Sequence, residues 1–434
     1  MVRFDRTFAL LFTVMLAIAA GNTALQSVLP ALGRSLGVAD SAVAAAFSVS
    51  ALLWVIAAPF WANRSDRTGR RLMVLVGMTG FSVSLFLCGI FLVAGINGWI
   101  APSVAFLLFI GGRLIYGTFG AAAPPAVQAL VAGRTSREER TRALSLLASA
   151  FGLGTILGPA FAPYLVLGHA GRIEIGLAGP AFVFCAFGVL VTLAAWRYLP
   201  RDGAVAHATG AAASYPSIGG QSSGASVTAA TAERGEAVGY FDRRIRTWIV
   251  IGLAMGHAQA MTGQAIGFLV IDRLALAPAD ALQPTGLVLI MGAGSALLAQ
   301  WGIIPLLDLR PRQLVLWGVT LAAAGSVMTG LATSLYGIAT GFALASLGFG
   351  FIRPGFTAGA SLAVGAAAQG SVAGKITAIN GAAFVLGPSI GVLLYEYWRP
   401  LPYLVAASVL VLLLGYAAAR LSRGDRAAPA SPAQ

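Results

Sequence analysis

Long apolar runs, separated by short charged or Pro/Gly-containing breaks, dominate the pattern along this chain. Twelve of these runs reach about 20 residues, the length that a helix needs to cross the hydrocarbon core of a bilayer. We expect spans at 7–29, 41–62, 72–94, 103–132, 142–167, 176–198, 246–271, 284–307, 313–332, 334–362, 373–396 and 401–420. They form two groups of six, so the predicted fold class is all-α integral membrane, with twelve transmembrane helices as two six-helix pseudo-symmetric bundles.

The stretch between the two groups differs from both. Residues 199–244 are rich in Gly, Ala and Ser and show no apolar period, which predicts a flexible cytoplasmic linker. We therefore expect an N-terminal bundle over 1–198, a C-terminal bundle over 245–421 and a disordered cytoplasmic tail over 422–434. The first apolar run follows Arg3 and Arg6, but it is too long for the core of a signal peptide and eleven further runs follow it.

Composition supports a membrane protein. Hydrophobic residues make up 58% of the chain and charged residues only 10%, whereas soluble proteins are about a quarter charged. The net charge of +13 is spread between the apolar runs and not along a basic helix with interleaved aromatics, so we expect no nucleic-acid partner. Cys88 and Cys185 lie inside apolar runs and are interpreted as small core residues, and no metal site is expected.

The positive charges also predict an orientation. With both termini in the cytoplasm, all but six of the 28 Lys and Arg residues fall in cytoplasmic segments; the six are Arg34, Arg113, Arg172, Arg273, Arg353 and Arg399. This asymmetry is what the positive-inside rule requires. We expect an integral protein of a bacterial cytoplasmic (inner) membrane with the lipid bilayer as its surroundings.

The two halves resemble each other in sequence. At an offset of 229, Pro125 matches Pro354, and the pair Gly158–Pro159 matches Gly387–Pro388; nearer the start of each half, Asp40 matches Asp280 at an offset of 240. Two repeats with a site at their interface are typical of transporters that work by alternating access. A duplication that serves stability alone is the alternative.

Small residues recur every four positions in the fifth and eleventh spans, where they allow close helix packing. A proline within each stretch removes a backbone hydrogen bond and permits a bend. We interpret these positions as helix-packing or hinge residues, with ordinary packing and a moving hinge both open: Gly154, Gly158, Pro159, Gly387 and Pro388.

A charged turn, ANRSDRTGRR (62–71), separates the second and third spans. Gly69 permits a positive φ, and Asp66 is suited to accept bonds from the amides at the start of a helix. The turn resembles the signature of the major facilitator superfamily, although Ala62 and Arg64 depart from it. That resemblance implies a conformational latch made of Asp66, Arg67, Gly69, Arg70 and Arg71, with its partner at the start of span eleven, near Ser371–Lys375. A weaker counterpart, DLRPRQ, lies at 308–313.

Two further stretches, FIGGRLIYGTFGAAAPP (109–125) and GLGTILGPAFA (152–162), resemble the fourth- and fifth-span motifs of the same superfamily. The second is similar to the motif of the twelve-span drug:proton antiporters. The resemblance implies secondary active efflux of small molecules driven by protons, with no ATP site and no cofactor, by a chain that is functional as a monomer.

Polar residues within spans are costly and are therefore the candidates for the pathway of substrate and protons. They are Arg113, Tyr116, Asn22, Gln26, His257, Gln264, Arg353 and Asn380. A histidine side chain has a near-neutral reference pKa, which makes His257 a candidate proton carrier, but it is equally interpreted as a neutral packing residue. For the amides, hydrogen bonding between helices is the alternative to substrate contact.

None of the fifteen Asp and Glu residues falls in the middle of a span. A cavity with arginines and no buried acid favours anionic or zwitterionic solutes. The leading hypothesis is therefore proton-coupled efflux of such a compound. The alternatives are a proton symporter that imports an organic acid and, more remotely, a membrane receptor or scaffold. No paired His/Asp set, nucleotide loop or metal-ligand spacing occurs in the spans, so we expect neither an enzyme nor catalytic residues.

Overall fold

A computed structural model describes residues 5–135, 137–200, 214–218, 228 and 236–424. Eleven of its helical segments are long and apolar enough to cross a membrane. A twelfth of similar length, α9 (Arg246–Leu274), is more polar because it carries His257, Gln259 and Gln264 in its middle. The prediction of an all-α, twelve-span membrane fold is confirmed over the described residues.

In the described part of the N-terminal half there are seven helices, two of which form one span. α4 and α5 are joined by a 3-10 turn at Gly120–Ala122, just before two consecutive prolines, and together they make up the fourth span. The helices are α1 (Arg6–Ser35), α2 (Asp40–Thr68), α3 (Arg70–Ile96), α4 (Pro102–Phe119), α5 (Ala123–Arg134), α6 (Arg137–Phe161) and α7 (Gly179–Tyr198).

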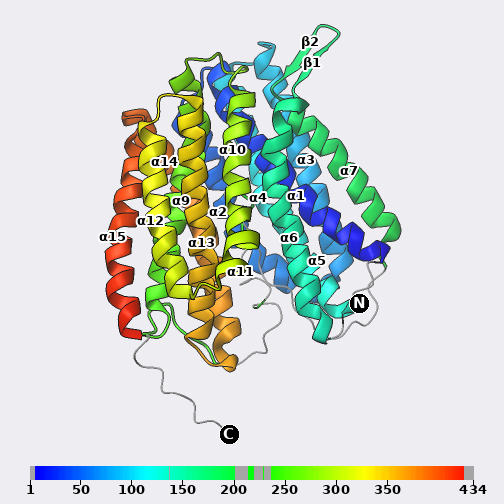
Figure 1. The fold of residues 1–434 in the computed structure, drawn as a ribbon. Helices are drawn as coiled ribbons and strands as arrows, with labels where there is room; N and C mark the ends of the chain where they lie inside the picture. The colour runs from blue at the N-terminus through cyan, green and yellow to red at the C-terminus, as the bar shows by residue number, and fades with distance from the viewer. Residues whose placement is uncertain (1–4, 136, 201–213, 219–227, 229–235, 425–434) are drawn as a thin grey trace.

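The C-terminal half also forms six spans, but a different one is interrupted. α10 and α11 are joined by a π-helical turn at Leu298–Ile303, and together they make up the eighth span. After α9 come α10 (Leu282–Leu297), α11 (Ile304–Leu307), α12 (Pro311–Leu331), α13 (Leu335–Leu362), α14 (Gln369–Tyr397) and α15 (Leu401–Gly424). Figure 1 shows the two halves side by side, and α1 begins at the same end of the molecule at which α15 ends. We call this the terminal end.

The opposite end carries a feature that the all-helical prediction did not include. Strands β1 (Leu167–Ala170) and β2 (Ile173–Gly176) pair antiparallel in the loop between α6 and α7, with His169 opposite Glu174. Gly171 has a φ of 65° in the tight turn, a value that favours glycine. The exposed strands project beyond the helices (Figure 1), and we call this end the hairpin end.

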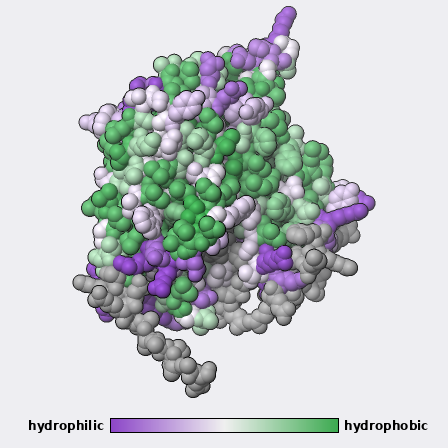
Figure 2. Space-filling model, viewed as in Figure 1, coloured by the Kyte–Doolittle hydropathy of each residue, from purple (hydrophilic) through white to green (hydrophobic). Residues whose placement is uncertain are grey.

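The outer surface fits a bilayer. Figure 2 shows apolar residues over the middle of the visible face and polar residues toward both ends. Large apolar side chains such as Ile56, Phe60, Leu107, Leu190 and Leu412 are exposed on the helices. Apolar surface of this extent needs a hydrocarbon environment. The protein is therefore an integral membrane protein.

Candidate functional site

Arg113 lies at the centre of the N-terminal half, on α4, and its side chain is completely buried. Its Nη2 donates to Asn22 Oδ1 on α1 and, at 3.4 Å, to Ser50 Oγ on α2. The guanidinium carbon lies 4.8 Å from the ring centre of Phe47 and 4.7 Å from that of Tyr116. These two rings stabilise the buried cation through their negative faces. Nε and Nη1 of Arg113 are buried without a hydrogen-bond acceptor.

A tyrosine from the predicted linker completes this cluster. The hydroxyl of Tyr215 accepts a bond from Arg113 Nη2 and lies 3.3 Å from Asn22 Oδ1. The ring of Tyr215 packs edge-on against Trp54 at 5.7 Å and against Tyr116 at 6.0 Å between ring centres. Only 2% of Tyr215 is exposed, so a residue of the segment between the two bundles is as buried as the core of the protein.

The residues after Tyr215 continue along α1. Asn22 Nδ2 donates to the carbonyl oxygen of Pro216 at 2.6 Å, and Gln26 Nε2 donates to Ser217 Oγ at 3.2 Å. The backbone amide of Ile218 donates in turn to Gln26 Oε1 at 3.1 Å. Both pathway candidates that the sequence placed on the first span therefore bind this segment.

Gln26 also joins the two halves. Its Nε2 donates to Gln264 Oε1 on α9 at 2.7 Å, so two of the pathway candidates are in direct contact. His257 lies about two helical turns before Gln264 on α9. It is half-buried, and its Nδ1 lies 2.8 Å from the carbonyl oxygen of Leu253 on the same helix. Its role in the proton pathway stays a prediction.

The second buried arginine, Arg353 on α13, lies in a separate cluster within the C-terminal half. Its Nη1 donates to Asn380 Oδ1 on α14 at 3.1 Å, and its Nη2 donates to Gln259 Oε1 on α9. The sequence predicted Arg353 and Asn380 as candidates, and the structure brings them together. Gln259 was missed, as were Ser50, Phe47 and Trp54 beside Arg113; nothing in their local sequence separates them from ordinary packing residues.

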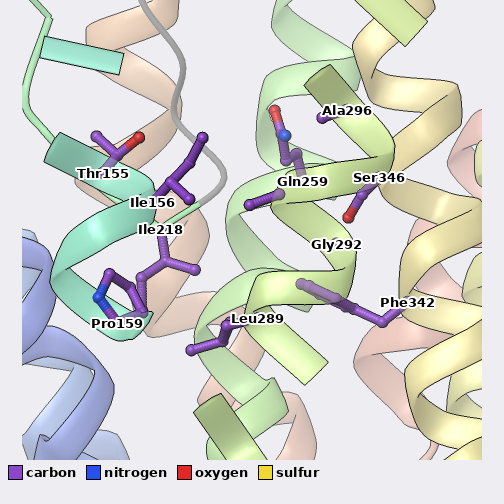
Figure 3. Close-up of a pocket in the computed structure, with 11 residues that line it drawn as sticks. Thr155, Ile156, Pro159, Ile218, Gln259, Leu289, Gly292, Ala296, Phe342 and Ser346 are labelled. Carbon is purple, nitrogen blue, oxygen red and sulfur yellow. The ribbon is translucent and has the colours of Figure 1, made fainter. Parts of the chain in front are cut away.

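A small cavity remains between the halves. Figure 3 shows Ile218 pointing into it between Thr155 and Pro159 of α6 on one side and Gln259 and Leu289 on the other. Its volume is about 30 Å³, enough for one or two water molecules. Sites for drug-sized ligands measure about 300–1,000 Å³. With residues 214–218 in place, this part of the centre has no room for such a ligand.

Charged side chains close the hairpin end across the two halves. Arg34 on α1 binds Asp40 of its own half, with Nη2 and Oδ2 2.6 Å apart, and Asp272 on α9, with Nη2 and Oδ2 3.0 Å apart. Asp272 also accepts a bond from the Tyr395 hydroxyl at 2.6 Å and lies 3.3 Å from Arg399 Nε. The sequence analysis did not predict this network, because its members are far apart along the chain.

This geometry and the comparison with known proteins agree. The sequence model of the Major Facilitator Superfamily matches residues 11–374. The chain belongs to the Major Facilitator Superfamily.

Known relatives of this major facilitator transporter include drug-resistance proteins. Multidrug resistance protein 1 of Bacillus subtilis is 28% identical over 187 residues, which are 43% of this chain and 43% of that protein, so the match spans less than half of that relative. Multidrug resistance protein 2 of the same organism is 26% identical over 379 residues, 86% of this chain and 83% of that protein. These similarities agree with the predicted resemblance to the drug:proton antiporter branch.

A solved structure shows the same fold. It is that of a bacterial homolog to the human lysosomal transporter Spinster, in an inward-facing and occupied conformation. The two chains superpose with a TM-score of 0.74 over 98% of each chain, at 11% sequence identity.

The superfamily's charged turn lies at the terminal end, between α2 and α3. Gly69 has a φ of 99°, which confirms the expected positive φ. Arg70 Nη1 donates to the carbonyl oxygen of Ala129 on α5 at 3.1 Å, and Arg71 donates to that of Trp196 on α7. These bonds stay within the N-terminal half. The side chain of Asp66 lies outside the described residues, so its latch to α14 stays a prediction. Arg67 is exposed, and its role in the latch also stays a prediction.

The expected partner of that turn, the start of α14, is engaged elsewhere. Ser371 Oγ accepts a bond from the backbone amide of Val238 at 3.1 Å, and Lys375 lies 5.1 Å from the ring centre of Tyr240. Both contacts come from residues just before α9. The described contacts of Ser371 and Lys375 therefore tie α14 to the segment that connects the halves.

The small-residue faces of the fifth and eleventh spans pack in the same way in the two halves. A Cβ at Gly158 would lie 2.3 Å from Thr23 Oγ1 on α1, and one at Gly387 would lie 2.6 Å from the Cβ of Ala260 on α9. α6 thus packs on α1 as α14 packs on α9. Pro159 and Pro388 lie inside these helices, and whether they act as hinges stays a prediction.

Proposed function

We propose that this major facilitator chain is a secondary active exporter that exchanges a small organic anion or zwitterion for protons by alternating access. The observation that carries the proposal is Arg113, a fully buried cation with Nε and Nη1 unpaired. Two free guanidinium donors in a low-dielectric site are suited to a carboxylate or another acidic oxygen. Among the described residues no Asp or Glu side chain is buried, so the site offers no counter-charge to a cationic drug.

Export is supported by the relatives, two of which are named as multidrug resistance proteins. In this proposal the proton gradient drives transport without a cofactor or ATP site, His257 is the first candidate for the proton-carrying group, and a single chain is the working unit. The terminal end faces the cytoplasm of a bacterial cell, because most of the arginines lie there.

The test uses three small phenolic compounds that differ mainly in charge. Inverted membrane vesicles are energised by respiration in the presence of a pH-sensitive dye, and 4-hydroxyphenylacetate (an anion), tyrosine (a zwitterion) or tyramine (a cation) is added. We expect the first two to collapse the proton gradient. We expect Arg113→Gln to abolish this response, and Arg172→Ala, which removes an exposed arginine from the hairpin turn, to keep it.

Two outcomes contradict the proposal. A response to tyramine alone would keep antiport but overturn the anionic substrate class. A response that persists at full size in Arg113→Gln would remove Arg113 from the site. Import of an organic acid would instead show as probe-dependent alkalinisation outside right-side-out vesicles that carry no imposed gradient.

A further inference from the structure

Residues Ser214–Ile218 come from the segment that connects the two bundles, yet they occupy the centre of the protein. Tyr215, Ser217 and Ile218 are all buried. A Ser-, Gly- and Ala-rich connection has no apolar period that would explain its burial, so specific contacts must hold it. The contacts are those of a ligand: a ring in an aromatic cage, a hydroxyl on Arg113 and a carbonyl oxygen on Asn22.

The segment touches both halves. On the N-terminal side it binds Asn22 and Gln26 of α1. On the C-terminal side Ser214 Oγ donates to the carbonyl oxygen of Thr377 on α14 at 3.3 Å, and Ile218 lines the small cavity together with Leu289 of α10 (Figure 3). Alternating access requires the halves to move against each other at this interface. A segment bonded to both of them stabilises the arrangement in which it is bound.

The chain can reach this place from the terminal end. α7 ends at Tyr198, 17 residues before Tyr215, and an extended chain of that length spans up to about 60 Å. This distance exceeds the length of a membrane-spanning helix, so withdrawal of the segment requires no change in the fold. The helices on either side of this connection end (α7) and begin (α9) at the terminal end, from which an exported substrate enters in the proposed mechanism.

We propose that Ser214–Ile218 is an internal ligand of the central site, and that the substrates are aromatic acids that displace it by binding Arg113. This inference rests on the proposed function for its substrate class. An aryl ring takes the place of the Tyr215 ring against Trp54 and Tyr116. Its acidic or hydroxyl oxygen takes the place of the Tyr215 hydroxyl and also meets Nε and Nη1 of Arg113, which Tyr215 leaves unpaired.

That difference gives the substrate its advantage. Tyr215 offers one neutral oxygen to a guanidinium with three donor nitrogens, whereas a carboxylate offers two charged oxygens in the geometry that a guanidinium prefers. The tethered segment has the advantage of a high local concentration. The apparent affinity of a substrate is lowered by the fraction of protein in which the segment is bound, so weakening the segment raises the apparent affinity.

The first experiment locates the segment without measuring transport. In the full-length purified chain with Cys88→Ala and Cys185→Ala, a single cysteine is placed at Ser217, which is buried, or at Ala237, which is exposed in the same connection. We expect Ser217→Cys to react with a maleimide at least about tenfold more slowly than Ala237→Cys, since closed states protect a thiol in proportion to their population. Equal rates overturn the proposal.

Ligand competition is measured on the same two variants. We expect 4-hydroxyphenylacetate to accelerate labelling of Ser217→Cys toward the rate of Ala237→Cys, and tyramine to leave it slow. Labelling that stays slow at every concentration of 4-hydroxyphenylacetate overturns the competition, and acceleration by tyramine overturns the acidic substrate class.

A transport experiment adds a matched pair of tyrosines. Tyr215→Ala removes the buried ring and hydroxyl, whereas Tyr240→Ala removes an exposed tyrosine of the same connection. We expect Tyr215→Ala to lower the KM for 4-hydroxyphenylacetate about tenfold, the equivalent of one or two lost hydrogen bonds, and Tyr240→Ala to change it less than twofold. An unchanged or raised KM in Tyr215→Ala overturns the proposal.

The two hypotheses fail in different ways. Accelerated labelling of Ser217→Cys with no proton movement would refute proton-coupled export and keep the internal ligand. Proton movement that depends on Arg113, together with rapid labelling of Ser217→Cys in the absence of any probe, would keep the exporter and refute the internal ligand.

Discussion

Arg113 and Arg353 are buried in membrane-spanning helices, one in each half, but their surroundings differ. Arg353 donates from Nη1 and Nη2 to side-chain oxygens of Asn380 and Gln259, both within its own half. Arg113 has only Nη2 engaged, and one of the groups it binds is the hydroxyl of Tyr215 from the connecting segment.

The two arginines differ in how far their donors are satisfied. A buried charge is tolerated where its donors are satisfied, and Arg353 then ties α9, α13 and α14 together. Arg113 keeps two donors unpaired and relies on the faces of Phe47 and Tyr116 for much of its stabilisation. Unsatisfied donors in a buried site can bind a ligand, which is why the proposed function places the substrate on Arg113 and not on Arg353.

The largest expected effect is on Arg113. Arg113→Gln removes the charge that attracts the substrate, and charged hydrogen bonds contribute about 1.5–3 kcal/mol, so transport of 4-hydroxyphenylacetate should fall roughly 100-fold in kcat/KM. Arg113→Lys keeps the charge but loses the planar donors, so its kcat/KM should fall about tenfold. Uptake into inverted vesicles measures both. An equal loss in Arg353→Gln would break the comparison between the two arginines.

Arg353 should matter for stability. Arg353→Met removes the donors on which Asn380 and Gln259 depend and should lower the free energy of unfolding by about 1–2 kcal/mol. Thermal unfolding of the detergent-solubilised protein measures this as a lower Tm. Arg113→Gln serves as the matched variant and should leave the Tm within about 2 °C, because it removes a buried charge with two of its three nitrogens unpaired. The opposite order of Tm values would reverse the assignment of the two roles.

A third arginine, Arg34, sharpens the comparison because its partners are carboxylates. Asp272→Asn weakens the tie between α1 and α9 at the hairpin end, and a partly buried ion pair of this kind contributes about 1 kcal/mol. Opening of that end should rise about fivefold. The measurement is maleimide labelling, from the hairpin side, of Ser389→Cys, whose hydroxyl now lies 2.7 Å from that of Ser48 across the halves. The exposed Arg172→Ala is the control, and an unchanged rate would show that the network does not hold this end closed.

The smallest expected effect comes from the two rings that face the Arg113 guanidinium, those of Tyr116 and Phe47. Tyr116→Leu removes one of the two rings that face the Arg113 guanidinium, an interaction worth about 0.5–1 kcal/mol. The KM for 4-hydroxyphenylacetate should rise about threefold, with kcat little changed. Phe47→Leu should do the same, since its ring lies on the same guanidinium. If either change abolished transport, the ring would be needed for the conformational change and not only to stabilise Arg113.

Hydropathy predicted most of the fold because the bilayer imposes it. Every span must be a helix of a certain length, so apolar runs and charged breaks suffice to place twelve of them. The span at α9 was also predicted, although the polar residues in its middle lower its hydropathy. The hairpin between α6 and α7 was missed because Gly171, Arg172 and their short flanks carry no alternation that stands out from a loop.

The site was predicted in part. Asn22, Gln26, Gln264 and Arg113 were found because polar side chains in hydrocarbon are conspicuous. Tyr215 was missed for the opposite reason. It lies in a polar, Gly-rich stretch where a tyrosine is unremarkable, and its burial depends on residues up to 193 positions away, such as Asn22. Contacts of this range are decided by the packed fold and leave no local pattern.

The close packing of α6 on α1 has a mechanical consequence. A Cβ at Gly154 would lie 2.6 Å from the carbonyl oxygen of Leu16, and one at Gly158 would lie 2.4 Å from that of Ala20. Two helices whose backbones are in contact over successive turns cannot slide past each other, so α1 and α6 move as one rigid body. Asn22 lies within the contacting stretch of α1, and Gln26 lies just beyond it. A tilt of α6 therefore moves the side-chain amides of Asn22 and Gln26 with it.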